Sequence, residues 1–232
     1  MSQPSLGIIL QARMGSTRLP GKILLPIGGR PLLEHVFERA ALLRAPAKLV
    51  VATSTLPGDD AVERFCRERG VACFRGDEAD VLERYRACAQ EHGFGLVIRL
   101  TGDNPFTDVE ELDRLVELRR EKDAAFAHSF ERLPIGVGAE IFTSASLEES
   151  ARLGHAPHHR EHVDEYLIEN PGQFTTVKLS IPASKNRPDL RLTVDTEADR
   201  LRATFIVEHA RSSPVETVEA IRLAGDYARA VR

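Results

Sequence analysis

Four short apolar runs, each followed by an amphipathic helical pattern, constrain the fold of this chain more than any other feature. The runs cover residues 6–10, 48–52, 71–74 and 96–100. They are almost continuously apolar rather than alternating, which is typical of strands buried on both faces. Helical patterns follow Pro31, cover 59–69 and 78–90, and follow Asp108. This alternation predicts a mostly parallel sheet with helices on both faces.

After about residue 122 the pattern mixes shorter strands and helices. We expect strands over 124–128, 140–142, 175–179 and 190–194, and helices over 144–152, 160–169 and 197–210. Ser213, Pro214 and Glu216 form an N-cap, a first-turn proline and a capping-box glutamate, which predict a last helix starting there. No internal repeat or low-complexity linker divides the sequence. We therefore expect one α/β, Rossmann-like domain over residues 1–232 with a mostly parallel mixed sheet.

Composition narrows the functional classes. The formal net charge of the 232 residues is −4, which argues against a general nucleic-acid binder. The three cysteines form no C-x-x-C pair, and an odd number of them favours a reducing compartment. No signal-peptide pattern opens the sequence, and the apolar runs are far shorter than a membrane span. We expect a cytoplasmic protein that binds neither nucleic acid nor membrane.

The segment from Gln11 to Lys22, QARMGSTRLPGK, follows the first predicted strand directly. Ligands of open α/β sheets bind beyond the carboxyl ends of the strands. Two glycines and two small hydroxyl residues allow backbone N–H groups to turn toward an anion, and Arg13, Arg18 and Lys22 add three cations. The spacing matches neither a Walker A loop nor a G-x-G-x-x-G fingerprint. A solvated basic turn is the alternative, but the combination favours phosphate binding.

Two aspartates stand where a divalent metal accompanying a triphosphate would need ligands. Asp103 follows the fourth predicted strand, and Asp195 ends a later one. Asp103 could instead form an Asx-turn, and Asp195 could merely cap the helix that begins near Glu197. For either residue alone the structural role is favoured. Together with the phosphate loop, the pair predicts a magnesium site.

These segments resemble the CMP-sugar synthetase family of cytidylyltransferases, which activate 3-deoxy-manno-octulosonate and sialic acids. The resemblance is greatest to the branch named after a spore-coat-polysaccharide biosynthesis protein. The motifs that carry it are QARMGSTRLPGK at 11–22, GDEADVLERY at 76–85, RLTGDNP at 99–105, REHV at 160–163 and RLTVDT at 191–196. They span nearly the whole chain in the expected order, and the first is highly specific.

The resemblance implies a glycosyltransferase-A-like three-layer sandwich that transfers CMP from CTP to an acidic keto-acid sugar and releases pyrophosphate. On the matching positions, Arg13 and Lys22 would be catalytic, and Asp103 and Asp195 would hold Mg²⁺. Asn104, Glu140, Arg160 and His162 would contact the acceptor. The nucleotide would be bound by Leu10, Gln11, Ala12, Arg13, Gly15, Ser16, Arg18, Lys22, Thr53, Arg75, Gly76, Asp80, Thr101 and Gly102. The product would serve polysaccharide synthesis.

Four histidines crowd into residues 155–162. His158 and His162 are four residues apart and would share a helix face. A zinc site is conceivable, but no Cys or carboxylate completes an evident ligand set. We favour an interface or a wall of the acceptor pocket, because the corresponding helix in the resembled family lies near both. The prediction is a homodimer with a dimerisation and acceptor segment at about 124–182.

Two other functions remain open. A related nucleotidyltransferase of the phosphonate or molybdopterin type would use another base or acceptor, and base choice depends on backbone hydrogen bonds that a sequence does not reveal. A non-catalytic nucleotide-binding module is a different class. The presence of Lys22, Asp103 and Asp195 counts against a mere binder, which needs no metal pair.

Overall fold

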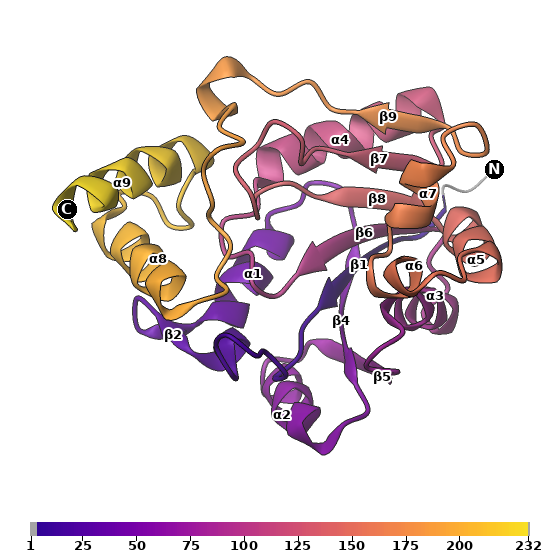
Figure 1. The fold of residues 1–232 in the computed structure, drawn as a ribbon, viewed down its shortest axis with the longest axis horizontal. Coiled ribbons are helices and arrows are strands. Elements are labelled where there is room, and N and C mark those ends of the chain that lie inside the picture. Colours follow the sequence, from indigo (N-terminus) through magenta and orange to yellow (C-terminus); the bar gives the residue numbers. More distant parts are fainter. Residues whose placement is uncertain (1–3, 232) are drawn as a thin grey trace.

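The four apolar runs form the parallel half of a seven-stranded sheet in the computed structural model, which describes residues 4–231 (Figure 1). They are strands β1 (Leu6–Gln11), β4 (Lys48–Ser54), β5 (Ala72–Gly76) and β6 (Leu96–Thr101). The strand order is β5-β4-β1-β6-β8-β7-β9. The chain therefore builds outward from β1 to β5 on one side and then continues on the other side, from β6 onward. The predicted α/β fold with a mostly parallel mixed sheet is confirmed.

Alternating side chains of these strands supply two separate cores, one on each face of the sheet. In β1, Ile8 and Leu10 belong to one buried cluster and Ile9 to the other. In β6, Ile98 and Val97 divide in the same way. A strand with apolar residues at every position can fill both cores, which explains the continuous apolar runs.

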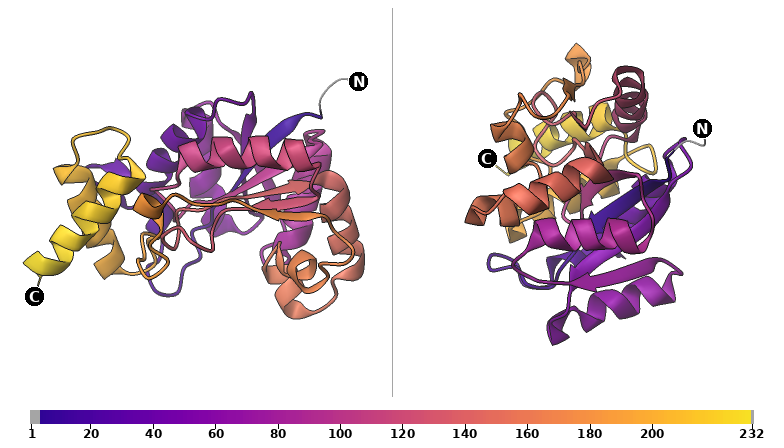
Figure 2. Two further views of the ribbon diagram at one scale, coloured as in Figure 1. Left: turned by 90° about the horizontal axis from the view of Figure 1, so that it is seen from above. Right: turned by 90° about the vertical axis from the view of Figure 1, so that its right-hand side faces the viewer.

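Helices cover both cores and complete the three layers. One face packs against α1 (Leu32–Ala41), α2 (Asp60–Glu68), α4 (Val109–Lys122), α8 (Glu197–His209) and α9 (Thr217–Ala230). The other packs against α3 (Val81–Glu91), α5 (Ser144–Leu153) and α7 (Glu165–Glu169). Figure 2 shows α4 and α5 on opposite sides of the sheet. No helix within residues 4–231 is long and apolar enough to cross a membrane.

The second half of the sheet reverses direction. β8 (Glu140–Thr143) pairs antiparallel with both β6 and β7 (Phe126–His128), and β9 (Thr176–Lys178) extends β7 in parallel. Because β8 runs against β6, its first residue lies at the carboxyl edge of β6. The sequence analysis did not predict the small hairpin of β2 (Pro26–Ile27) and β3 (Arg30–Pro31), or the 3-10 helices at 22–24, 57–59 and 183–185.

Two predicted elements in the second half of the chain differ in the structure. Residues 190–194 are not a strand: a single parallel bridge joins Arg191 to Ile135, and Val194 donates its N–H to the Asp103 carbonyl instead of to a strand. The helix predicted at 160–169 is two short helices, α6 (Pro157–Glu161) and α7. Val163, which lies between these two helices, is fully buried in the core.

The last helix starts later than its sequence indicated. It begins at Thr217, and Glu216 before it has an extended backbone. Ser213 does not cap it; instead the Ser212 hydroxyl accepts the N–H of Glu216. The proposed N-cap and capping box are therefore wrong, although the helix itself is present.

Candidate active site

A cavity of about 1220 Å³ opens at the carboxyl edge of β1 and β6, where the strand order changes direction. This is the place where open α/β sheets bind ligands. Pockets for one small ligand measure about 300–1,000 Å³, so this cavity has room for two. The predicted site residues that line it are Gln11, Ala12, Arg13, Gly15, Ser16, Arg18, Lys22, Asp80, Thr101, Gly102, Asp103, Asn104, Glu140, Arg160, His162 and Asp195.

The glycine loop forms one wall of the cavity and folds back on itself. Gly21 donates its N–H to the Met14 carbonyl at 3.0 Å, and this bond closes the loop. Gly21 has φ +69°, a left-handed conformation that favours glycine. The turn at Gly21 brings Lys22 to the start of a 3-10 helix at the cavity wall.

Asp59, which sequence reasoning did not single out, fastens this loop to the sheet. Its carboxylate accepts the Met14 N–H at 2.6 Å and the Ser54 N–H at 3.1 Å, and it also accepts the Ser54 hydroxyl. Burial of Asp59 opposes ionisation, but these hydrogen bonds outweigh burial and hold its pKa below the ordinary value. Asp59 is thus a positioning residue for the phosphate loop.

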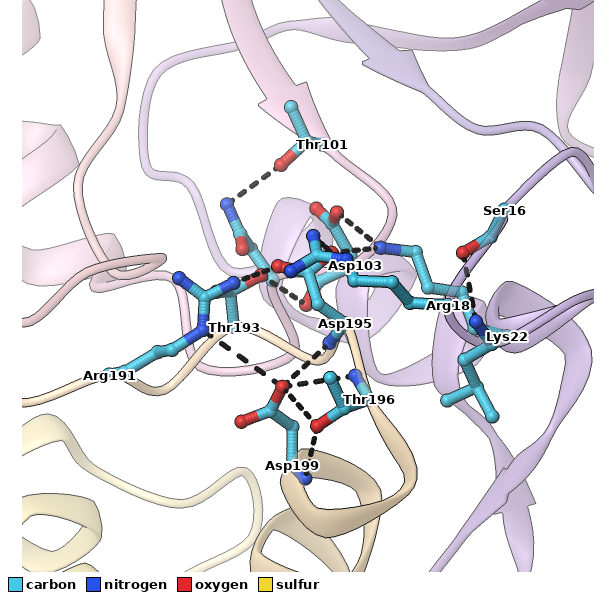
Figure 3. Close-up of polar contacts among 12 residues, drawn as sticks. Ser16, Arg18, Lys22, Thr101, Asp103, Arg191, Thr193, Asp195, Thr196 and Asp199 are labelled. Carbon is cyan, nitrogen blue, oxygen red and sulfur yellow. Dashed lines mark hydrogen bonds and ion pairs between the residues drawn. The ribbon is translucent and has the colours of Figure 1, made fainter.

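Asp103 and Asp195 converge on one point, which the Lys22 ammonium occupies (Figure 3). Lys22 Nζ lies 2.7 Å from Asp103 Oδ2 and 2.7 Å from Asp195 Oδ1. The two oxygen atoms are therefore at most twice that distance apart. An upper limit of this size lets one ion, or an ion with a bridging water, join the two carboxylates. The binding of a metal there stays a prediction.

Backbone contacts between two distant segments cause this convergence. Val194 donates its N–H to the Asp103 carbonyl at 2.9 Å, and the Thr193 hydroxyl donates to the same oxygen at 3.3 Å. The 190s segment also lies very close to Gly136, at φ +87°, where a Cβ would be 2.6 Å from the Thr193 Cβ. Only glycine fits this approach.

The alternative structural roles of the two aspartates are not what the structure shows. Thr196, rather than Asp195, caps α8, in a capping box with Asp199. The turn after β6 is closed by a backbone bond from Asn104 N–H to the Thr101 carbonyl and by the Asn104 amide on the Thr101 hydroxyl. The Asp103 carboxylate takes no part in that turn, and its ion-pair partner is Lys22.

More cations than carboxylates surround this point. Arg18 lies 3.2 Å from Asp195, and Arg191 also pairs with Asp195. Arg13 lines the same cavity and has no ion-pair partner among residues 4–231. Arg13, and Arg18 with its 60% exposed side chain, are thus placed to meet an anion such as a triphosphate in the cavity.

A second wall consists of residues 78–81, which connect β5 to α3. Arg84 is buried and donates to the carbonyls of Asp77 and Glu78, which fixes the loop from below. Asp80 caps α3 by accepting the Glu83 N–H at 2.9 Å, and it also pairs with Arg160. Asp80 and Arg160 therefore join two walls of the cavity.

Four predicted nucleotide-binding residues do not line the cavity. Leu10 and Thr53 are fully buried in the sheet. Arg75 turns away toward Asp60 and Glu63, to which it is bound at 2.6 and 2.9 Å. Gly76 lies against Arg84 and Phe74.

On the acceptor side, Glu140 is committed to a buried ion pair. Arg99 Nη1 donates to both of its carboxylate oxygens, at 2.9 and 3.0 Å, because the β6–β8 register sets the two residues opposite each other. Burial raises the pKa of Glu140 to about 7, against the opposing effect of Arg99. Glu140 lines the cavity, but its charge is already compensated, so it is poorly suited to bind a sugar through that charge.

His158 and His162 do not share a helix face as predicted, because α6 ends at Glu161. His162 lines the cavity with an extended backbone just after α6, whereas His158 and His159 contact Glu169 at 2.9 and 2.6 Å. His158, His159 and Glu169 lie close enough together to hold a metal ion, and Glu169 is the carboxylate that the sequence did not reveal. However, His159 Nδ1 accepts the N–H of Ala156, which leaves the proton on Nε2 facing Glu169. The contacts of His158 and His159 with Glu169 therefore join α6 to α7.

Sequence reasoning missed several residues of the cavity wall. Arg191 and Thr193 stand in the motif at 191–196 that contains Asp195, so their position was a signal. Glu78 and Glu161 are charged neighbours of predicted residues. Phe130, Ile135 and Gly136 carry no such signal, because tertiary contacts alone bring them to the wall.

The fold and the site together define an α/β nucleotidyltransferase, with a cationic glycine loop at a strand-order switch and paired carboxylates opposite it. The chain belongs to the cytidylyltransferase family, whose model matches residues 7–224.

Relatives and a solved structure agree with this assignment. The spore coat polysaccharide biosynthesis protein SpsF of Bacillus subtilis is 34% identical over 211 residues, 89% of this chain and 88% of that protein. An 8-amino-3,8-dideoxy-manno-octulosonate cytidylyltransferase of Shewanella amazonensis is 38% identical over 122 residues, 51% of this chain and 49% of that enzyme. The structure of a cytidylyltransferase from Leptospira borgpetersenii superimposes with a TM-score of 0.89 at 32% identity, covering 98% of this chain and 96% of that one.

Proposed function

We propose that this protein transfers CMP from CTP to an acidic keto-acid sugar and releases pyrophosphate, in the cytoplasm, for the synthesis of a surface polysaccharide. The observation that carries the proposal is the convergence of Lys22, Asp103 and Asp195 beside the glycine loop. The cytidylyltransferase family supports the base, and the octulosonate cytidylyltransferase of Shewanella amazonensis supports the acceptor class.

Mg²⁺ fits the oxygen donors of Asp103 and Asp195, which are the ligand type that this ion prefers. When bound, it would neutralise phosphate charge and assist departure of pyrophosphate. The chain's own groups would orient the reactants. Loop N–H groups and Arg13 would hold the phosphates, and Lys22 would stabilise charge that grows on them as the bond to the α-phosphate breaks. Residues 78–81 would lie against the nucleoside, while Asn104 and His162 would contact the acceptor.

The proposal is tested by pyrophosphate release from each of the four nucleoside triphosphates with Mg²⁺, against a panel of keto-acid sugars. We expect release with CTP and an acidic sugar, and only background release with ATP, GTP or UTP. A neutral sugar of the same size is the matched control for the acceptor. Equal release with all four triphosphates, or without any acceptor, would refute the proposal.

A homodimer formed through residues 124–182 is part of the proposal. Within this segment the large apolar side chain of Ile168 on α7 is 46% exposed and would be covered in such a dimer. Light scattering of the purified protein would give the mass directly, and a monomer at micromolar concentration would contradict this part.

A further inference from the structure

The Lys22 ammonium stands at the point where the two proposed metal ligands converge. Its Nζ makes the same 2.7 Å contact with Asp103 Oδ2 and with Asp195 Oδ1, and its side chain is only 11% exposed. A divalent ion could bind these two oxygen atoms only if the Lys22 ammonium left them. The Lys22 ammonium and a divalent metal ion would therefore compete for the same position.

The local charge balance makes this competition unfavourable for a metal ion that arrives alone. Lys22, Arg18 and Arg191 each contact Asp103 or Asp195, and Arg191 also lies 3.9 Å from Asp199, so the charges of both carboxylates are already compensated. A divalent ion would therefore have to displace cations that already pair with the carboxylates, and like charges a few ångströms apart repel strongly in a partly buried site.

A triphosphate reverses that balance. It brings about four negative charges to the loop from which Lys22 and Arg18 extend, and both side chains can then leave the carboxylates for phosphate oxygens. We propose that Lys22 is an internal cation that holds the metal position until the nucleotide withdraws it, so that Mg²⁺ and CTP bind cooperatively. The inference rests on the proposed function, because it takes Asp103 and Asp195 to be the metal ligands.

The consequence is opposite to what is expected of a simple catalytic lysine. Lys22→Met should lower turnover, yet it should strengthen metal binding in the absence of nucleotide. Because coupling between two ligands is reciprocal, the variant should also lose part of the mutual enhancement between metal and CTP.

The test is a Mn²⁺ titration of the nucleotide-free protein, followed by electron paramagnetic resonance. We expect Lys22→Met to bind Mn²⁺ at least about tenfold more tightly than the unmodified protein, since a full charge leaves both ligands. Adding Asp103→Asn to Lys22→Met should remove the gain, which shows that the titration reports on this site. Lys48→Met is the matched control, because Lys48 begins β4 at the amino-terminal edge of the parallel strands, away from the cavity. This variant should leave Mn²⁺ binding unchanged.

Arg18→Ala keeps the inference testable if Lys22→Met does not fold. The Arg18 side chain is 60% exposed, so its removal should not disturb folding, and it should strengthen Mn²⁺ binding by a smaller factor. Unchanged or weaker Mn²⁺ binding in folded Lys22→Met would overturn the inference. That result is distinct from failure of the proposed function, which would appear as absence of CTP-dependent pyrophosphate release by the unmodified protein.

Discussion

At the scale of single residues, the site depends on pairings between positions far apart in the chain. Lys22 and Asp195 are separated by 173 residues, and Lys22 and Asp103 by 81. Each of these side chains is partly buried, so each charge needs its partners more than a surface charge would. Substitutions at this point should therefore affect binding and catalysis together rather than one at a time.

The two aspartates should act as one unit. We expect Asp103→Asn and Asp195→Asn each to lower metal-dependent pyrophosphate release by about 100-fold or more, because each removes a ligand charge from the same ion. The double variant should be little worse than either single variant, since residues that serve one ion are not additive. Initial rates at saturating CTP measure this.

Two further measurements make that comparison decisive. Glu161→Gln removes a carboxylate from the same cavity wall outside the pair, and it serves as the control for a general loss of negative charge. Multiplying losses in the double variant would show that Asp103 and Asp195 do not share an ion. A melting curve for each variant separates loss of activity from loss of fold.

At the scale of elements, the loops depend on anchors that lie outside them. Asp59 fastens the phosphate loop to the end of β4 through the Met14 N–H. Lys185 is 7% exposed and lies 2.7 to 2.9 Å from Asp108, Glu110 and Glu111, so it fastens the segment before Asp195 to the start of α4. Each anchor orients a segment without contacting the space that a ligand would fill.

Asp59→Asn should loosen the phosphate loop. The amide keeps the shape of the side chain but accepts the Met14 and Ser54 N–H groups less strongly than a carboxylate does. We expect the KM for CTP to rise about tenfold, because an ordered loop is replaced by a mobile one. Steady-state kinetics measure the change, and an unaltered KM would show that the loop holds its shape without Asp59.

The same residue gives an expected pH dependence. The folded pKa of Asp59 lies below its ordinary value of 3.8, so its contribution to the free energy of unfolding is present above about pH 4 and is lost as pH falls through the folded pKa. Denaturant unfolding between pH 6 and pH 3 should therefore show a smaller acid-induced loss in Asp59→Asn than in the unmodified protein. Equal losses would assign the acid sensitivity to other carboxylates.

At the scale of the whole molecule, the cavity lies between the loops that follow two neighbouring strands and a segment from much later in the chain. The phosphate loop follows β1, the Asp103 turn follows β6, and the Asp195 segment approaches from the far end of the chain near α8 (Figures 1 and 3). A ligand that contacts all three should therefore stabilise the whole fold rather than one region of it.

CTP with Mg²⁺ should raise the melting temperature more than ATP, GTP or UTP. At a ligand concentration about 100 times the dissociation constant, the free energy of unfolding rises by about 2.7 kcal/mol. For a domain of this length that corresponds to a shift of about 5–10 °C. Differential scanning fluorimetry with each triphosphate measures it, and equal shifts for all four would contradict a preference for cytidine.

The amino-acid sequence by itself determined those features that depend on neighbouring residues. Continuous apolar runs defined the parallel strands, because a strand buried on both faces has no polar positions. The glycine loop with Arg13, Arg18 and Lys22 was recognisable because its residues are contiguous, and Asp103 and Asp195 were candidates because each follows a predicted strand. The start of the last helix, the unbroken helix at 160–169 and the 190–194 strand were predicted wrongly, since partners outside those segments decided them.

Only the tertiary structure decided which of those residues meet. The bond from Val194 to Asp103 brings the two carboxylates to Lys22, and the β6–β8 register sets Glu140 against Arg99. Asp59 became a positioning residue through contacts that no local pattern records. The physical reason is that periodicity and capping report the environment of a segment, whereas the partner of a charge depends on how distant segments pack in space.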